Sequence, residues 1–184
     1  MACGVKREPL EGVDRTRLLY RYEFEAAPIA LLPNGREVVA KVLDAGLILL
    51  AADAFGAGRR CVEMAVEYAK QREQFGVKIA QFQALRHQLV NMALEVEPCR
   101  GMYWYAAHAW DKNETSASHA AALAKAHIVD RCLQVARDNI EAHGGIGFTW
   151  EYDAHIWLKR AMFDWAWLGG PPLHRARAAD LAAW

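Results

Sequence analysis

Residues 71–76, QREQFG, carry the first arrangement of side chains in this chain that could bind a ligand. Arg72 stands near the expected end of a helix, three residues before the ring of Phe75 and four before Gly76. An arginine in such a place can hold a phosphate while the neighbouring ring covers a base. The spacing by itself indicates such a nucleotide site only weakly.

A second candidate is HGGIGF, residues 143–148, which follows another expected helix. Gly144 and Gly145 carry no Cβ, so a ligand could approach the backbone closely here. Paired glycines after a helix more commonly form a left-handed cap and a turn. The residues alone leave both roles open.

The stretch FDWAWLGGPPLHR, residues 163–175, breaks a helical pattern with two glycines and two prolines. It contains no carboxylate after Asp164. General-base catalysis needs a titratable group within hydrogen-bond reach of the reacting carbon. The stretch therefore predicts a tight turn without an acid, followed by a helix that begins at Pro171 or Pro172, where proline is tolerated.

No metal site is expected from the histidines and cysteines. The histidines on the expected helices share no metal-ligand spacing and are His108, His119, His127 and His155. The cysteines form no Cys-x-x-Cys pair and are Cys3, Cys61, Cys99 and Cys132. We interpret them as reduced, buried thiols of a cytosolic protein. The tryptophans that crowd the C-terminal third predict core or interface packing.

The composition excludes several classes of protein. The chain has 184 residues, 54% of them hydrophobic, which predicts a sizeable core and one domain, or one domain plus a fragment of another. Lysine plus arginine and aspartate plus glutamate both number 22, so the formal charge is zero. This argues against a nucleic-acid or anionic-membrane surface. The most apolar run, residues 42–55, is too short to span a bilayer, and no secretory signal is visible. A cytoplasmic location follows as an expectation.

Most of the elements that must position these residues are helices. Apolar residues recur at helical spacing over residues 37–71, 81–111, 116–142 and 152–163. Pro98 should kink the second of these helices, because it removes one backbone hydrogen bond. Thr115 or Ser116 should cap the third.

Residues 15–32 behave differently from the helical segments. They alternate with a period of two and are rich in aromatic residues, which predicts a strand. A lone strand is unstable, so this one should pair with a missing sheet or lie against the helices. The predicted fold is all-α: an antiparallel four-helix bundle preceded by a remnant β-strand.

Two stretches taken together resemble one family. AVEYAKQREQFGVKIAQFQALRHQLVNMA and, at the right distance, EAHGGIGFTWEYDAHIWLKRA are similar to the C-terminal helical domain of acyl-CoA dehydrogenases. The resemblance covers residues 36 to about 170, and residues 15–32 resemble the last strand of the family's middle β-domain. It implies two parts: residues 1–35 as a remnant of the β-domain and residues 36–184 as the helical bundle.

The resemblance also implies a cofactor and the residues that contact it. The family uses FAD and an acyl-CoA thioester, from which a carboxylate removes the α-proton while the β-hydride passes to the flavin. Arg72 matches the arginine that contacts the FAD pyrophosphate of a neighbouring subunit, and Phe75 the aromatic beside that cofactor. Gly144 and Gly145 match glycines that approach its adenosine. Glu141 stands where the family usually has a glutamine.

The catalytic base of the family has no counterpart here. Counted without gaps from Gly144, the usual glutamate falls on Leu168, and the threonine two residues later becomes Gly170. Some members place the base on the first helix of this domain, where this chain has Gly46. Asp44 is two positions away and should face another direction. We therefore assign no catalytic residue.

Three hypotheses follow for a dehydrogenase-like chain without its base. It is either a base-less subunit of an FAD-dependent acyl-CoA dehydrogenase, or a non-catalytic helical partner that completes the FAD site and interface of a full-length subunit. The stretch GFTWEYDAHIWLKRA resembles actinobacterial members acting on steroid CoA thioesters, some of which are hetero-oligomers with one silent subunit. A truncated or degenerate relative is the other explanation for the vacancy. The third hypothesis is an unrelated helical interaction module.

Overall fold

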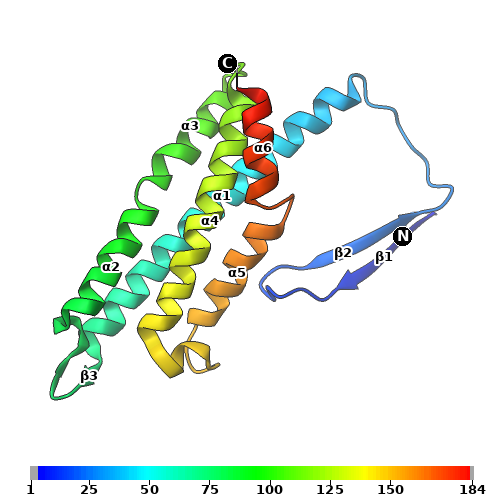
Figure 1. Ribbon diagram of the computed structural model, residues 1–184. Helices are drawn as coiled ribbons and strands as arrows, with labels where there is room; N and C mark the ends of the chain where they lie inside the picture. Colours follow the sequence, from blue (N-terminus) through cyan, green and yellow to red (C-terminus); the bar gives the residue numbers. More distant parts are fainter. Residues whose placement is uncertain (1–3, 183–184) are drawn as a thin grey trace.

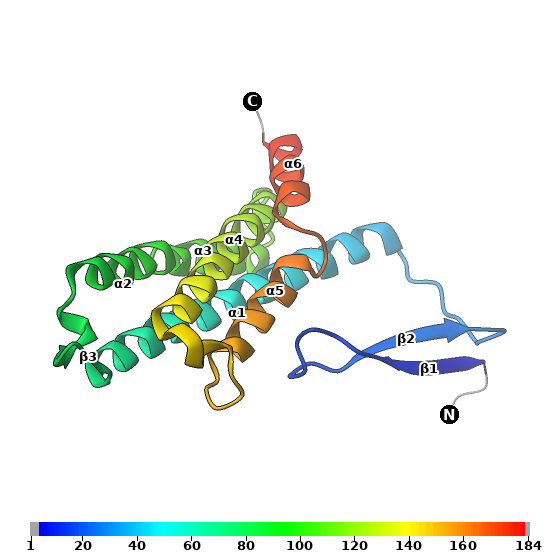
Figure 2. The ribbon, with the colours of Figure 1, turned by 60° about the horizontal axis from the view of Figure 1, so that its bottom comes forward.

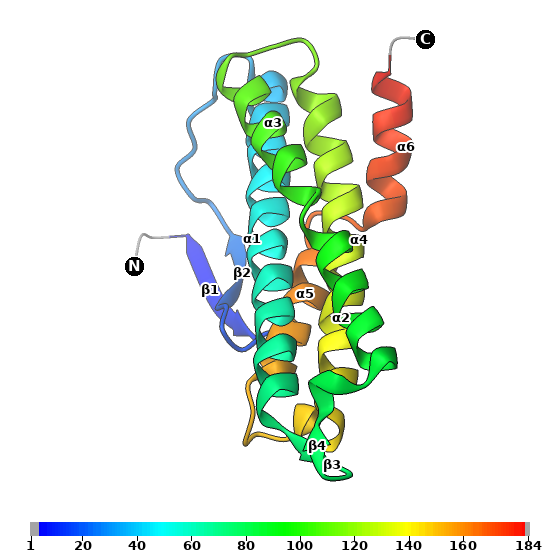
Figure 3. The same cartoon turned by 90° about the vertical axis from the view of Figure 1, so that its left-hand side faces the viewer.

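The computed structural model describes residues 4–182 (Figure 1). The α-helices of this range are α1 Gly35–Gln71, α2 Gln83–Val96, α3 Cys99–Asp111, α4 Ala117–His143, α5 Ala154–Ala166 and α6 Pro171–Leu181. The strands are β1 Val5–Leu10, β2 Leu19–Phe24, β3 Glu73–Gln74 and β4 Val77–Lys78, and two 3₁₀ turns are η1 Ile79–Gln81 and η2 Gly144–Phe148. The segments α1, α2 with α3, α4, and α5 run alternately up and down the bundle (Figures 1 and 3). The predicted all-α antiparallel bundle is confirmed.

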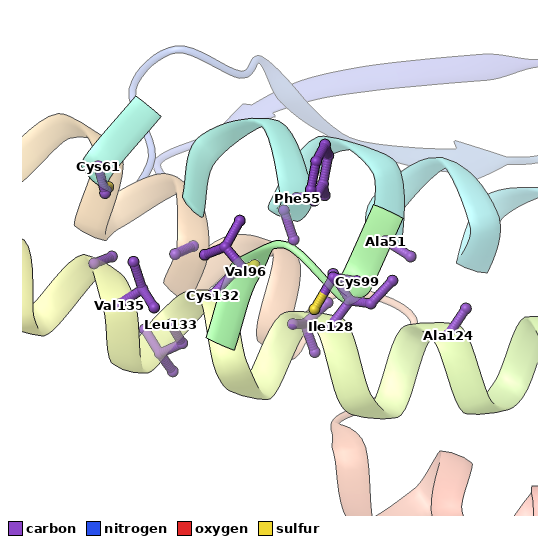
Figure 4. Packing of buried hydrophobic residues seen from close by; sticks show 14 of the residues in the cluster. Ala51, Phe55, Cys61, Val96, Cys99, Ala124, Ile128, Cys132, Leu133 and Val135 are labelled. Carbon is purple, nitrogen blue, oxygen red and sulfur yellow. The ribbon is translucent and has the colours of Figure 1, made fainter. Parts of the chain in front are cut away.

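The core lies where α1 packs against α4 (Figure 4). Ala51 of α1 and Ile128 and Val135 of α4 are fully buried, and a buried branched side chain stabilises a fold by roughly 1.5–3 kcal/mol. The helices approach each other closely at Gly58, where an added Cβ would lie 2.8 Å from the Sγ atom of Cys132. The small residues of α1 and α4 thus let two long helices share one tight core.

The cysteines behave as their spacing predicted. Cys61, Cys99 and Cys132 are free and buried in this core, and burial raises the pKa of the Cys61 thiol to about 12. Burial thus keeps the Cys61 thiol protonated, and all three cysteines pack in the core as small apolar side chains. Cys3 lies outside the described residues.

The predicted helix over residues 81–111 is divided at Pro98 into α2 and α3. Both Glu97 (φ −59°, ψ −39°) and Pro98 (φ −64°, ψ −25°) keep helical dihedrals. The break is therefore the expected kink, made because proline has no N–H to donate. The predicted position of the kink at Pro98 is confirmed, but the segment forms two helices and not one kinked helix.

Two of the predicted helix ends are confirmed, and one predicted cap is not. α4 ends at His143 because Gly144 adopts φ +63°, and α6 begins with Pro171 in its first turn. Ser116 occupies the N-cap position of α4 without capping it; its hydroxyl donates instead to Glu114.

The tryptophans divide between core and surface. Trp157 and Trp165 pack against the main core, whereas Trp150 and Trp167 are 71% and 45% exposed. Trp150 and Trp167 therefore do not have the predicted core role, and an interface role for them stays a prediction. No helix within residues 4–182 is long and apolar enough to cross a membrane.

The predicted lone strand is one arm of an antiparallel hairpin. β2 pairs with β1 from Val5 opposite Phe24 to Leu10 opposite Leu19. The prediction was wrong about the partner, because β1 reads VKREPL and lacks the apolar alternation of a half-buried strand. Its charged side chains suit an exposed edge: Lys6 pairs with Glu8 at 2.9 Å.

Candidate functional site

The residues predicted to contact a cofactor lie at one end of the bundle, where α1 and α4 both end (Figures 1 and 3). Arg72 and Phe75 follow α1, and Glu141, Gly144 and Gly145 lie at the end of α4. Helix geometry therefore brings together two motifs that are far apart in the sequence. Within residues 4–182 no group of three potential metal ligands is found there or elsewhere.

Phe75 sits at the tip of the β3–β4 hairpin in an unfavourable conformation. Phe75 (φ +56°) and Gly76 (φ +80°) are the two central residues of the turn, and two positive φ values are typical of a type I′ turn. Asparagine or glycine usually occupies the first of these positions. Phe75 is 92% exposed, and its ring forms an edge-to-face pair with that of Phe82, with ring centroids 6.1 Å apart. The chain thus holds a large apolar ring in water at a conformational cost.

Arg72, three residues before Phe75 in the chain, has an exposed guanidinium without an ion-pair partner among residues 4–182. Its backbone N–H donates to the Tyr68 carbonyl at 2.8 Å and ends α1, while its side chain is exposed. The neighbouring Glu73 pairs with Lys78 at 2.6 Å. No carboxylate among residues 4–182 lies within ion-pair distance of Arg72, so its charge is available to an anion.

The three glycines of η2 differ in what their surroundings require of them. Gly144 needs its positive φ, and a Cβ on Gly147 would lie 2.9 Å from the Ile140 carbonyl oxygen. Gly145 has neither constraint: a Cβ there would meet nothing within 4 Å. The fold itself therefore leaves the surface at Gly145 open, and its match to a cofactor-contacting glycine stays a prediction.

Glu141 has a partner that the sequence did not reveal. Its carboxylate accepts a hydrogen bond from the Gln88 amide at 3.2 Å. Gln88 comes from α2, and nothing in the spacing of the two residues predicts the pair. An amide side chain therefore stands next to the position where the family has a glutamine.

A second region, the Leu168 pocket, lies far from this end. It is an open surface pocket of about 480 Å³ lined by Arg17, Leu18, Leu19, Gly46, Leu49, Leu50, Phe163, Trp167 and Leu168. The two positions that could hold the family's base meet in it: a Cβ on Gly46 would lie 2.8 Å from Cδ1 of Leu168. No carboxylate of the described residues lines this pocket.

Two buried basic side chains hold the turn that carries Leu168 and the last turn of α5 before it. Leu168 (φ +59°) and Gly169 (φ +98°) both adopt left-handed conformations. Nε2 of His174 lies 2.9 Å from the Leu168 carbonyl oxygen and donates to it, and Nζ of Lys125 donates to the Asp164 carbonyl. Burial lowers the pKa of Lys125 to about 8 and the pKa of His174 below its usual value.

Asp44 faces away from this pocket, as expected from its position on the helix. It is 3% exposed and accepts hydrogen bonds from Ser118 and from Arg177, both at 2.6 Å. It therefore links α1 to α4 and α6 and is not free to act as a base.

A long stretch of α1 separates the Leu168 pocket from Arg72 and Phe75. Gly46 and Gln71 are separated by 25 residues of α1, or about 37 Å at the helical rise. Arg72 and Phe75 therefore lie on a different part of the surface from the Leu168 pocket.

Comparison with known proteins places this architecture in a family. Residues 33–180 match the model of the acyl-CoA dehydrogenase C-terminal domain, and the chain belongs to that family. Over 171 residues it is 40% identical to the acyl-CoA dehydrogenase FadE34 of Mycobacterium tuberculosis, and over 155 residues 36% identical to IpdE2 of the same organism. The solved structure of the Tcur3481-Tcur3483 steroid ACAD G363A variant superposes with a TM-score of 0.90 at 29% identity over 98% of the chain.

The chain corresponds to only part of each relative. The matches cover 92% and 84% of this chain but 24% of FadE34 and 45% of IpdE2, and 49% of the steroid ACAD chain. The family and the fold are therefore established for this chain, whereas the activity of the complete relatives is not carried over with them.

Proposed function

We propose that this chain serves FAD-dependent α,β-dehydrogenation of an acyl-CoA thioester, as a subunit that lacks its own catalytic base. One observation supports the proposal. Leu168 and Gly46, on or near which the resemblance places the family's base, lie against each other in a largely apolar pocket. A side chain without a titratable group cannot remove the α-proton.

The residues at the end of α1 and α4 fit a flavin nucleotide. Arg72 would pair with the pyrophosphate, Phe75 would cover a ring of the cofactor, and Gly145 leaves room for close approach. Bound FAD supplies the acceptor for the substrate's β-hydride. Because these residues lie about 37 Å along α1 from the Leu168 pocket, they would serve the cofactor of a neighbouring subunit.

In this proposal the Leu168 pocket contacts the acyl chain of the substrate. Its leucines, Phe163 and Trp167 offer an apolar wall that could exclude water from an acyl chain. The group that takes the α-proton would come from a second, base-bearing subunit in a homo- or hetero-oligomer. The names of the relatives, which include a steroid ACAD, point to lipid and steroid substrates.

A second candidate function is a purely structural one. In it, this chain is a helical partner that supplies Arg72 and Phe75 to a complete dehydrogenase and takes no substrate. The exposed, strained Phe75 favours a role toward another subunit in either case. The division of the chain into a β-domain part (residues 1–35) and a bundle (residues 36–184) belongs to this proposal; the separate hairpin supports it.

The visible spectrum of the purified chain tests the proposal. We expect a colourless chain that gains flavin only when it is co-expressed with a full-length acyl-CoA dehydrogenase subunit. Ferricenium-coupled turnover of acyl-CoA substrates by that complex, lost when the partner's base is replaced, would support the base-less subunit. A complex whose turnover is the same with and without this chain would support the structural partner. Stoichiometric flavin and turnover by the chain alone would contradict both.

A further inference from the structure

The β1–β2 hairpin lies beside the helical bundle, and contacts outside its two strands must hold it there (Figure 2). Neither strand packs broadly against a helix within residues 4–182. An isolated two-stranded hairpin is marginally stable at best in water. The hairpin must therefore be held by the loop that joins its strands or by the segment that follows it.

That loop carries a buried ionic contact to two helices. The Arg17 guanidinium pairs with Asp53 of α1 and, at 3.2 Å, with Asp164 of α5. The same guanidinium lies 4.8 Å from the ring centroid of Phe163. Asp164 is 0% exposed, so removing Arg17 would take a hydrogen-bond donor away from a fully buried group and one of two guanidinium partners away from Asp53, which is destabilising.

Arg160 of α5 completes the contact. It binds both oxygens of Asp53, at 2.9 and 3.0 Å, and donates to the Thr16 hydroxyl at 3.0 Å. Asp14 in turn accepts from the Thr16 hydroxyl at 2.6 Å and lies 3.4 Å from Arg17. We name the five charged residues Asp14, Arg17, Asp53, Arg160 and Asp164 the Arg17 clamp.

The charges of the clamp balance when one proton is present. Asp164 lies beside Asp53, and burial together with that neighbour raises the pKa of Asp164 to about 8, while Arg160 lowers the pKa of Asp53. With Asp164 protonated, two carboxylates face two guanidinium groups. Lys125 of α4 also faces Asp164, but burial lowers its pKa to about 8, so it loses its charge in the same pH range.

The clamp holds one wall of the Leu168 pocket. Leu18 and Leu19, which directly follow Arg17, line that pocket together with Gly46 and Leu168. We propose that Arg17 is a positioning residue that fixes this hairpin wall against α1 and α5, and so sets the width of the acyl pocket. The inference rests on the proposed function only in calling the pocket an acyl site.

Hydrogen exchange followed by mass spectrometry on the full chain tests the clamp. Arg17→Met should reduce the protection of residues 14–24 by about tenfold or more and leave α4 protected. Arg15→Met is the matched control, since Arg15 is an exposed arginine of the same loop without an ion pair in the described structure. Arg17→Lys keeps the charge and should restore part of the protection.

The pH dependence separates a clamp from general stabilisation. Protection factors of residues 14–24 should fall in the natural chain as pH rises toward about 8 and then level off, and they should stay level in Asp164→Asn, which cannot ionise. Equal protection in Arg17→Met and Arg15→Met would overturn the proposal. So would a collapse of α4 in Arg17→Met that Arg17→Lys does not relieve.

A second readout connects the clamp to the substrate. In the flavin-loaded complex with a full-length subunit, Arg17→Met should raise KM for the acyl-CoA severalfold and leave kcat within about twofold. An unchanged KM in a chain whose hairpin has loosened would contradict the positioning role. An inactive complex would contradict the proposed function, while the exchange data would still decide whether Arg17 holds the wall.

Discussion

At the scale of single residues, the unusual backbone conformations coincide with the candidate sites. Phe75 and Leu168 are large apolar residues with positive φ values, a conformation that costs an L-residue about 1–2 kcal/mol. One ring is exposed at the end of the bundle, and the other side chain lies in the base-less pocket. The sequence marked both positions as candidate site residues. It did not reveal their left-handed backbone conformation, because nothing local in QFGV or WLGG distinguishes left-handed from extended residues.

Replacement of Phe75 by asparagine should separate stability from function. Asparagine tolerates the left-handed position of a type I′ turn, so Phe75→Asn should raise the free energy of unfolding by about 0.5–1 kcal/mol. The same variant should retain less flavin in the complex with a full-length subunit. Urea unfolding and the flavin-to-protein absorbance ratio measure the two effects. A less stable Phe75→Asn, or unchanged flavin retention, would count against a role for the ring outside this chain.

The glycines of η2 give a second test at this scale. Gly145→Ala should change the free energy of unfolding by less than about 0.5 kcal/mol, since its Cβ would be in open space. Gly147→Ala should cost about 1–3 kcal/mol, because its Cβ would collide with the Ile140 carbonyl. Thermal unfolding of the two variants measures this contrast. If Gly145 serves close approach, Gly145→Ala should still bind less flavin in the complex.

At the scale of elements, helical periodicity predicted most of the bundle, and Pro98 and Pro171 marked real boundaries. β1 could not be predicted, because its polar side chains show no alternation and its stability comes from β2 and from the Arg17 clamp. Gly46 and Leu168 come together through the packing of α1 against the end of α5. Local spacing does not reveal such long-range contacts. The sequence could therefore identify Gly46 and Leu168 as candidates, but it could not predict that they lie together.

The packing of α5 against α1 and α4 predicts an unusual pH dependence. Asp164 binds its proton more tightly in the folded chain, where its pKa is raised to about 8, than in the unfolded chain, where it is about 3.9. Its contribution to the free energy of unfolding therefore falls as pH rises from about 4 to about 8. Lys125, whose folded pKa is lowered to about 8, acts oppositely above pH 8.

Urea unfolding across this range measures the Asp164 contribution. The stability difference between the natural chain and Asp164→Asn should shrink steadily from pH 5 to about pH 8. Asp180→Asn removes an exposed carboxylate of α6 and is the control. A difference that is constant with pH would show that Asp164 is ionised throughout and would remove the charge argument for the clamp.

At the scale of the whole molecule, the bundle presents two surfaces that cannot serve the same cofactor. Arg72 and Phe75 follow the end of α1, whereas the Leu168 pocket lies beside its N-terminal half, about 37 Å away along the helix. A flavin held by the first surface in a neighbouring subunit would leave the second to a different active centre. Under the proposed function, the two surfaces would therefore belong to different active centres of an oligomer.

This separation predicts what restoring the base would do. Leu168→Glu places a carboxylate where Gly46 and Leu168 now meet, yet the chain alone should remain inactive, because its proposed flavin contacts lie at the other end of α1. In a complex with a partner whose own base is replaced, the same variant should regain turnover if a flavin faces the pocket. Leu173→Glu, an exposed leucine nearby on α6, is the control. Ferricenium-coupled assays measure both cases, and turnover by isolated Leu168→Glu would show that one chain can hold flavin and substrate together.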